Sequence, residues 1–544
     1  MSPLVTRPLP PAIELRQERA RQRQEPELSS LRSRFLEPVL VFAAAFAVYG
    51  GVGIWAAVGL EVVLGDAEAR LEHAFSVFWN DPSKLAAIGF YWPPLQTLVL
   101  LPMAAVKPLA MSLVALPLTS ALFGAGLLVV LDRSLTSLGI ERALRWALVA
   151  VFGLNPMIFF YAVNGMAESL YLFFLTLALA LFVRWARHPH WHDLPLIGLA
   201  FAFGVLSRYE VGVWLPLVLV AVVAILMRRR ADVPQIESAI LALVLPVGYA
   251  LLLWTFLTWS ILGDPLGWLK ALFPRSAGTT SAVPEPLTGL VLDALEIHLT
   301  LFLPAAAVAA VVLTVAVRRR SMVGLALGAS LVLNLVTTLL ILLRSQSTTF
   351  LELRYNMRGM PLVLLALGWL LMTLAPARRR LAGVAAVGLL VLAIPATAWT
   401  MLTNEHVGAE RVFLRALLSL ESTGFVDEQR TMAEFIREHV PGKNRVLTDD
   451  AKTFGIALLD GHPARYVDRI DVGDETWLEL RDHPIGRIDY FLVRRDPAGP
   501  DLIAIRYPGL HDESLALPSF TRVIFVHGQY ALYAIDWQRT PRGR

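Results

Sequence analysis

The chain has 544 residues, of which 56% are hydrophobic and only 17% are charged, a balance that excludes an ordinary soluble globular protein. Its formal net charge of +4 does not indicate nucleic-acid binding, because the arginines form short tags beside apolar runs and not a basic face with interleaved aromatic residues. The absence of cysteine excludes disulfides and thiolate metal sites. The apolar blocks are long enough to cross a bilayer as helices of about 20 residues. We therefore predict a polytopic α-helical membrane protein.

Residues 1–34 are rich in Pro, Gln, Glu and Arg and contain few apolar side chains, which is the composition of a disordered tail. The arginines of this tail place it in the cytoplasm. The apolar run 35–60 follows without a small-residue cleavage pattern. We expect this run to be a retained signal anchor and the first membrane span.

The stretch 64–94 is the first polar, charged segment, and it is too amphipathic to be a spacer. If residues 66–78 form a helix, its polar residues fall on two sides, one with Asp66, Arg70 and His73 and another with Glu68 and Glu72. The apolar residues that we expect to face the membrane are Leu71, Phe75 and Phe78.

Two other interpretations of this helix stay open. In the first, the polar face of the helix is only solvated and Asp66 is the helix N-cap. Alternatively, Glu68, Glu72 and His73 bind a metal ion, although their spacing alone is a weak indication.

The apolar segment 95–106 is short and interrupted by prolines, so we expect it to lie in the membrane interface within an external loop, 61–110. Further spans are predicted at 111–131, 146–163, 167–187, 194–209, 211–227, 238–262, 290–317, 322–343, 360–375 and 381–402. Arginine tags at Arg228–Arg230, Arg318–Arg320 and Arg378–Arg380 mark cytoplasmic loops. About eleven helices after a cytoplasmic N-terminus leave the C-terminus outside.

Segments predicted to be external carry charges beside long apolar runs. They are the turn VNGMAES with Glu168, the turn SRYEVG with Arg208, the loop 263–289 and the polar stretch 344–359. Such charges cost about a few kcal/mol each at membrane depth and normally mark a function.

Structural alternatives exist for two of these charges, because Glu168 also suits the start of a helix and Arg208 has Glu168 or Glu210 as a partner. Arginines on the external side depart from the trend that the three arginine tags follow, in which basic residues collect in cytoplasmic loops. Together with Arg354 and Arg358 in the polar stretch, they favour an anionic, phosphate-bearing substrate.

From residue 404 the composition is that of a soluble protein. Helical segments (DEQRTMAEFIREHV, AKTFGIALL, ETWLEL) alternate with strands (NRVLT, ARYVD, YFLVRR) before a hairpin that turns at Gly528. We predict an external α/β domain, 404–544, that recognises the acceptor or covers the site. PGKNRV lacks the pattern of a phosphate-binding loop, and Asp449 and Asp450 are interpreted as turn and cap residues.

The order of these motifs resembles the GT-C glycosyltransferases, in particular the branch of the protein O-mannosyltransferases and the lipid A aminoarabinose transferases. The motifs are GDA at the opening of an external loop, FYWPPL, NPxxxxYA before Glu168, SRYEVG, and RY before a proline-bearing span. The resemblance covers about residues 35–375, within a predicted transmembrane domain of 35–403, and leaves the soluble domain outside it.

The resemblance implies an enzyme that transfers a sugar from a polyprenyl-phosphate donor and inverts the anomeric carbon. Asp66 stands at the position of the catalytic carboxylate, which deprotonates or orients the acceptor hydroxyl. Arg208 matches a basic residue that binds the donor phosphate, and Arg354 and Tyr355 form the RY motif that binds the same phosphate or the sugar. Glu168, at a position where relatives usually carry Asp, lies beside donor or acceptor.

Glu68 and Arg70 complete the expected substrate-binding set. Ala67 separates Asp66 from Glu68, so a strictly adjacent acidic pair is absent, which argues against a metal-bridging role. No cofactor is firmly implied, and a divalent metal ion is compatible with the motifs without being predicted.

The sequence thus predicts a glycosyltransferase in the plasma (inner) membrane, with a cytoplasmic N-terminus and an external C-terminal domain. Its expected partners are a polyprenyl-phosphate sugar, the bilayer and an acceptor that is protein, glycan or lipid. The alternative is a transporter or flippase of lipid-linked or anionic solutes, which would favour internal repeats and broken helices meeting at mid-bilayer.

Overall fold

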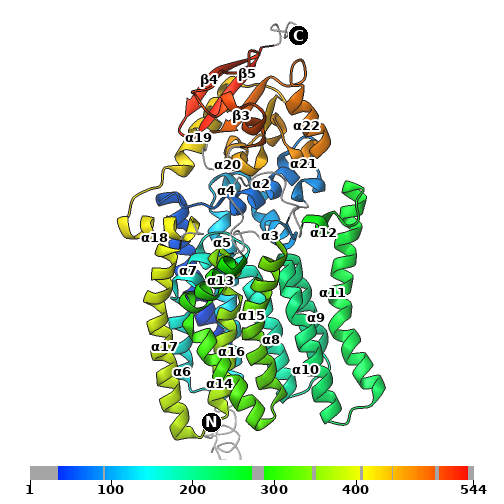
Figure 1. The fold of residues 1–544 in the computed structure, drawn as a ribbon, viewed down its shortest axis with the longest axis vertical. Helices are drawn as coiled ribbons and strands as arrows, with labels where there is room; N and C mark the ends of the chain where they lie inside the picture. Colours follow the sequence, from blue (N-terminus) through cyan, green and yellow to red (C-terminus); the bar gives the residue numbers. More distant parts are fainter. Residues whose placement is uncertain are drawn as a thin grey trace, which may run out of the picture.

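The computed structural model describes residues 35–89, 92–271, 287–345, 351–404, 408–443, 445–495 and 501–536. The predicted tail 1–34 lies outside these ranges, as do Phe90 and Tyr91 of the FYWPPL motif and part of the predicted loop 263–289. The long helices form an upright bundle, and a small α/β unit lies at one end of it (Figure 1).

The bundle is built from helices that follow the apolar runs of the sequence. They are Phe35–Gly59, α5 (Ala115–Ser137), α6 (Arg142–Gly153), α7 (Pro156–Val163), α8 (Glu168–Arg187), α9 (Asp193–Ser207), α10 (Trp214–Arg228), α11 (Val233–Leu262), α13 (Leu287–Leu301), α14 (Leu303–Arg319), α15 (Met322–Ser345), α16 (Met360–Met372) and α17 (Pro376–Thr403).

By length and composition, seven helices in the described part of the chain are able to cross a membrane, and nine if each of two bent pairs counts as one span. The pairs are α6 with α7, bent by 69°, and α13 with α14, bent by 89°. The remaining two predicted spans correspond to the shorter apolar helices α9 and α16. The segment predicted to lie in the interface forms another short helix, α3 (Leu95–Ala104).

A helix start with proline explains both bends. The side chain of Asn155 accepts a hydrogen bond from the Met157 amide at 3.1 Å, so α7 begins anew at Pro156. Pro304 likewise lies in the first turn of α14, as its second residue. Each bend therefore follows from local sequence.

The three arginine tags lie together at one end of the bundle, which we call the basic end. An Arg228 Nη1 donates to the carbonyl of Arg320 at 2.6 Å, and Arg319 donates to the carbonyl of Thr373 at 2.8 Å. The α/β unit lies at the opposite end, the sheet end (Figure 1). The tags and the predicted external charges are thus on opposite ends, as a consistent topology requires.

Between the bundle and the α/β unit lie α2 (Gly65–Trp79), η2 (Leu85–Ile88), α3 and α4 (Lys107–Met111) (Figure 1). Helix α2 packs against α3 on one side and α20 of the α/β unit on the other. Leu71 and Phe75 are fully buried in these contacts, and only Phe78 of the predicted membrane-facing set is exposed, at 42%. The prediction that Leu71 and Phe75 face the membrane was wrong, because both are buried inside the protein, in a helix that packs against α3 and α20.

The C-terminal unit contains the predicted helices and strands. They are α18 (Ala409–Ser419), α19 (Phe425–His439), β1 (Val446–Thr448), α20 (Asp450–Asp460), β2 (Tyr466–Val467), α21 (Arg469–Val472), α22 (Asp474–Asp482), β3 (Tyr490–Arg494), α23 (Leu502–Arg506), β4 (Thr521–His527) and β5 (Tyr530–Ile535). The sheet order is β2-β1-β3-β5-β4, with β1 parallel to β2 and β3, and β5 antiparallel to β3 and β4. Gly528 turns the final hairpin with a φ of 52°.

Polar contacts attach this unit to the segments that precede α3. The Thr423 hydroxyl donates to the carbonyl of Glu61 at 2.7 Å, and the Asp427 amide donates to the Glu61 carboxylate at 2.9 Å. Lys443 forms an ion pair with Asp81. Asp449 accepts from the Leu502 amide at 2.9 Å, which agrees with a structural role for this acid.

Candidate active site

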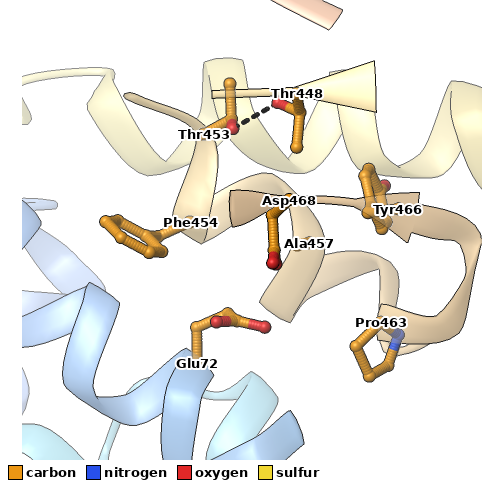
Figure 2. Close-up of a pocket in the computed structure, with 8 residues that line it drawn as sticks. All are labelled: Glu72, Thr448, Thr453, Phe454, Ala457, Pro463, Tyr466 and Asp468. Atoms are coloured by element: carbon orange, nitrogen blue, oxygen red, sulfur yellow. Dashed lines mark hydrogen bonds between the residues drawn. The ribbon is translucent and has the colours of Figure 1, made fainter. Parts of the chain in front are cut away.

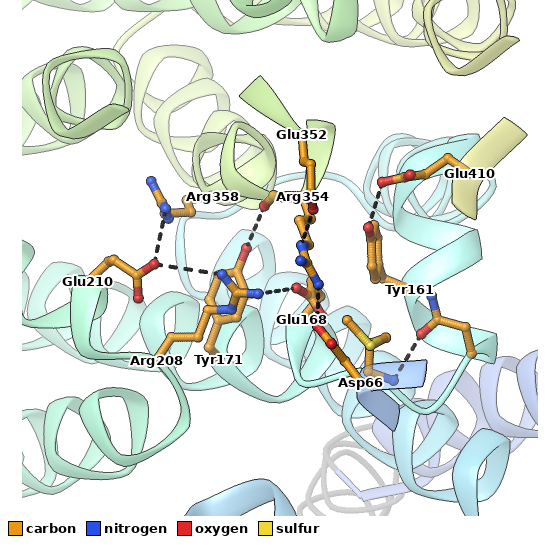
Figure 3. A network of polar contacts seen from close by, with 12 residues as sticks. Asp66, Tyr161, Glu168, Tyr171, Arg208, Glu210, Glu352, Arg354, Arg358 and Glu410 are labelled. Atoms are coloured by element: carbon orange, nitrogen blue, oxygen red, sulfur yellow. Dashed lines mark hydrogen bonds and ion pairs between the residues drawn. The ribbon is translucent and has the colours of Figure 1, made fainter. Parts of the chain in front are cut away.

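Asp66 lies in the first turn of α2, at the sheet end, and its carboxylate faces an arginine from a distant segment. The Arg354 Nη1 donates to Asp66 Oδ2 at 2.7 Å, and the Arg354 Nε lies 2.6 Å from Glu352 Oε2 (Figure 3). The N-cap residue of α2 is Leu64, so Asp66 does not cap the helix. Its side chain is 37% exposed, which leaves the carboxylate accessible from outside the bundle.

The surrounding guanidiniums set the protonation state of Asp66. Burial by itself raises the pKa of this carboxyl, but the positive charges of Arg354, Arg70 and Arg208 outweigh burial and hold the pKa below its ordinary value. Asp66 is therefore a carboxylate at neutral pH, ready to accept a hydrogen bond from a hydroxyl group.

A buried ion pair joins two further predicted residues. Arg208, between α9 and η3 (Tyr209–Val213), donates through Nη2 to Glu168 Oε1 at 2.6 Å (Figure 3). Its Nη1 lies 3.6 Å from Glu210, which is also 3.5 Å from Arg358 Nη2. Both structural alternatives for Arg208 thus occur together, and its charge is compensated by two acids.

Tyr355 lies at the centre of the arginines. The guanidinium carbons of Arg208, Arg354 and Arg358 are 4.9, 5.2 and 5.9 Å from the centroid of its ring. Tyr171 of α8 adds a second ring under Arg208, at 5.4 Å, and its hydroxyl donates to the carbonyl of Arg354 at 3.4 Å. Aromatic faces attract cations, so these tyrosines hold the guanidiniums in one layer.

Arg358 of this layer and Arg70, which lies outside it, keep unused hydrogen-bond donors. Arg358, in η6 (Met357–Gly359), is 1% exposed, and Arg70 of α2 is 4% exposed and lies over the ring of Trp92 at 4.9 Å. In each, Nε and Nη1 have no hydrogen-bond partner among the described residues. Buried donors without partners are destabilising, and phosphate oxygens are well suited to satisfy them.

The turn before α8 positions Glu168. Gly165 adopts a φ of 80°, its amide donates to Ser120 Oγ at 3.0 Å, and its carbonyl accepts from Gln96 Nε2 at 3.0 Å. A Cβ at this position would lie 2.5 Å from the Cβ of Leu116. Glycine is therefore required in the VNGM turn for both its φ angle and its close packing.

The other polar residues of α2 face the C-terminal unit. Glu68 is buried and accepts from Gln429 Nε2 at 3.1 Å, and burial raises its pKa to about 7. Glu72 faces a small pocket with Asp468 of the α/β unit (Figure 2). The structure therefore does not bring Glu68 together with Arg208 and Arg354, and the alternative of a merely solvated helix face was wrong.

His73 packs between rings of Trp92 and Phe454, with centroids 5.9 and 5.3 Å away. The described residues contain no group of three or more His, Asp or Glu side chains arranged to hold a metal ion. Glu68, Glu72 and His73, the three residues of the alternative metal site, therefore do not form such a group.

The sequence did not point to three residues beside the site. Tyr171 and Tyr161 belong to apolar runs, where aromatic residues are ordinary. Glu410 of α18 accepts from the Tyr161 hydroxyl at 2.6 Å (Figure 3). The sequence does show Glu410 as an acid in an amphipathic helix next to a span. It does not show that its partner is Tyr161, which lies 249 residues away.

Solved structures with a similar fold agree with this architecture. ArnT from Cupriavidus metallidurans bound to undecaprenyl phosphate matches with a TM-score of 0.56 and 14% identity, over 90% of this chain and 97% of that one. The same protein in the apo state gives 0.54 and 16% over the same shares. The archaeal oligosaccharyltransferase AglB from Archaeoglobus fulgidus, in complex with an inhibitory peptide and a dolichol-phosphate, gives 0.48 and 12% over 88% and 71%. No protein-family model and no curated protein sequence matches the chain.

The likeness to ArnT shows that this multi-pass membrane protein shares the fold of that protein, in agreement with the predicted helical membrane domain followed by an α/β unit. The match with ArnT covers 90% of this chain, which is more than residues 1–403 could supply. The matched part therefore includes some of the C-terminal unit. The expectation that the resemblance ends near residue 375 was wrong. Short, divergent strands carry little sequence signal, whereas the arrangement of a sheet is visible in the fold.

Proposed function

We propose that this protein transfers a sugar from a polyprenyl-phosphate-linked donor to an acceptor hydroxyl at the outer face of the plasma membrane, with inversion at the anomeric carbon. The observation that carries the proposal is the position of an ionised Asp66 carboxylate beside a layer of buried guanidiniums. One of the two ArnT structures described above, which matches this chain with a TM-score of 0.56, is bound to undecaprenyl phosphate.

The acid–base part of the reaction falls to Asp66. The acceptor oxygen attacks the anomeric carbon while its proton passes to the Asp66 carboxylate. A carboxylate with a lowered pKa is a weak base, so its main contribution is to orient the hydroxyl and to receive the proton late in the reaction. Its 37% exposure allows that proton to reach solvent afterwards.

The guanidiniums serve the leaving group. As the bond between the anomeric carbon and the phosphate oxygen breaks, its electron pair stays on the lipid phosphate. Arg70 and Arg358 have unused buried donors, and they are the first candidates to bind this phosphate. Arg208 is already paired with Glu168 and Glu210, so we assign it to holding the arginine layer together with Tyr355.

Arg354 links the two parts of the site. It contacts Asp66 directly and lies over Tyr355 beside Arg208. A bound phosphate would compete with Asp66 and Glu352 for this guanidinium. Donor binding would then free Asp66 to accept the hydrogen bond of the acceptor.

The test is to incubate the purified protein with a panel of polyprenyl-phosphate sugars and to measure released polyprenyl phosphate by mass spectrometry. The proposal expects release that depends on one class of sugar and rises with acceptor. In proteoliposomes, movement of intact donor between leaflets without any released polyprenyl phosphate would instead support a transporter and contradict the proposal.

A further inference from the structure

A pocket at the basic end lies far from the site described above. It has a volume of about 280 Å³ and is formed where α8 and α10 end and α11 begins. Its lining includes Trp185, Trp191, Leu226, Arg229, Arg230 and Gln235. This volume is near the lower limit of about 300 Å³ for ligand pockets, so it suits a headgroup better than a whole large ligand. We call it the basal pocket.

The charge of the basal pocket is positive. Its lining contains Arg229 and Arg230 and no acidic residue. Neither arginine forms an ion pair with a carboxylate in the described part of the chain. The neighbouring Asp232 instead caps α11, where it accepts from the Gln235 amide at 3.0 Å.

One of the two guanidiniums is held in place. Arg229 donates through Nη2 to the carbonyl of Ala186 and lies 5.7 Å from the ring centroid of Trp185. Trp185 is 2% exposed, so it forms a rigid floor under the guanidinium. A fixed guanidinium loses little conformational freedom when it binds an anion.

The surroundings of the pocket are those of a membrane interface. Trp191 at its rim is 58% exposed, and indole rings prefer the depth of lipid headgroups. Exposed apolar side chains occur near the starts of α9 and α11, with Leu196 and Leu199 of α9 42% exposed and Val233 of α11 67% exposed. Acyl chains would lie on this surface when a phosphate occupies the pocket.

We propose that the basal pocket binds the phosphate headgroup of an anionic membrane phospholipid. Basic pockets between helices at a membrane surface are suited to such headgroups, and the apolar flank distinguishes a lipid from free phosphate. A basic tag that only sets orientation needs neither the pocket nor the tryptophan floor. This site is independent of the proposed glycosyl transfer.

The test measures lipid binding to the purified full chain in detergent by native mass spectrometry. Phosphatidylglycerol and phosphatidylcholine with identical acyl chains are compared, and inorganic phosphate is added as a competitor. We expect phosphatidylglycerol to bind at least tenfold more strongly than phosphatidylcholine. We expect a loss of at least tenfold in the double variant Arg229→Ala/Arg230→Ala, and a smaller loss in Arg230→Ala alone, which keeps the Arg229 contacts intact.

The matched control is Arg378→Ala/Arg380→Ala, which removes the same charge from an exposed tag at the same end. It should bind phosphatidylglycerol like the wild type. An equal loss in this control, equal binding of both lipids, or unchanged binding by the Arg229/Arg230 variants would overturn the proposal. Displacement of the lipid by millimolar inorganic phosphate would overturn the assignment to a lipid.

Discussion

The guanidinium of Arg354 donates a 2.7 Å hydrogen bond to the carboxylate of Asp66, although 288 residues separate them in the chain. This contact joins the first helix after the first span to the segment before α16. It fixes Asp66 on the same layer as Arg208 and Tyr355. The arrangement has consequences for the pH dependence, the stability and the reaction of the protein.

The first prediction concerns the pH dependence of transfer. Arg354 supplies the largest of the charge effects that lower the pKa of Asp66, and burial alone would raise it. In Arg354→Gln the pKa of Asp66 should rise, so the acid limb of the pH–rate profile should move to higher pH. Arg415→Gln, at an exposed position of α18, is the control and should leave that limb unchanged. An unaltered acid limb in Arg354→Gln would contradict the assignment of the limb to Asp66.

The second prediction concerns Glu68 and the stability of the contact between α2 and the C-terminal unit. Burial raises the pKa of Glu68 from 4.5 to about 7, so the folded protein binds its proton more tightly than the unfolded chain. Stability should therefore fall as pH rises from about 4.5 to 7, by about 3 kcal/mol in all. Glu68→Gln should remove this loss and raise Tm at pH 8 but not at pH 4.

The control for Glu68→Gln is Glu434→Gln, which changes an exposed acid of α19. Its Tm should follow the wild type at every pH. Equal Tm gains at pH 4 and pH 8 in Glu68→Gln would mean that the ionised carboxyl is not the cause.

The third prediction concerns the ion pair of Glu168 and Arg208. Glu168 is fully buried and Arg208 is nearly so, and their 2.6 Å contact leaves little water between them. Removal of one partner leaves a buried charge, so Glu168→Gln and Arg208→Met should each destabilise the fold by about 3–5 kcal/mol. The double variant should lose much less than the sum, as measured by thermal unfolding in detergent. Strictly additive losses would show that the two charges do not depend on each other.

The fourth prediction concerns the VNGM turn. Gly165→Ala would place a Cβ 2.5 Å from Leu116 in a residue with a φ of 80°. We expect a lower Tm and a loss of transfer activity, because the turn positions Glu168. Gly388→Ala in α17 is the control, since a Cβ there meets nothing within 4 Å. Wild-type Tm and activity in Gly165→Ala would contradict the role of this turn.

Much of the fold followed from local pattern. Apolar length marked each span, short apolar segments between helical ones marked the strands of the C-terminal unit, and the arginine tags placed four separate segments on one end. Asp66, Glu168, Arg208 and Arg354 could thus be expected to share a side. Their actual meeting in one layer depends on helix packing, which a single sequence does not specify.

The failures concern contacts between distant segments. The amphipathic pattern of α2 is the same whether lipid or protein covers Leu71 and Phe75, so the pattern did not reveal that this helix packs between α3 and α20. For the same reason the sequence does not reveal Gln429 as the hydrogen-bond partner of Glu68, because the two residues lie 361 positions apart. The pairing of Arg208 with two acids, and the unused donors of Arg70 and Arg358, likewise depend on the packed structure.

The central claim is that Asp66 acts on the acceptor in a glycosyl transfer, and the release of polyprenyl phosphate by Asp66→Asn tests it most directly. The amide keeps the size of the side chain but removes its charge and its ability to take a proton. Glu68→Gln makes the same change two residues away on a carboxyl that faces Gln429. We predict that Asp66→Asn loses release by at least about a thousandfold while retaining a wild-type elution profile in detergent, and that Glu68→Gln stays within about threefold of wild type. Near-normal release by Asp66→Asn would contradict the mechanism.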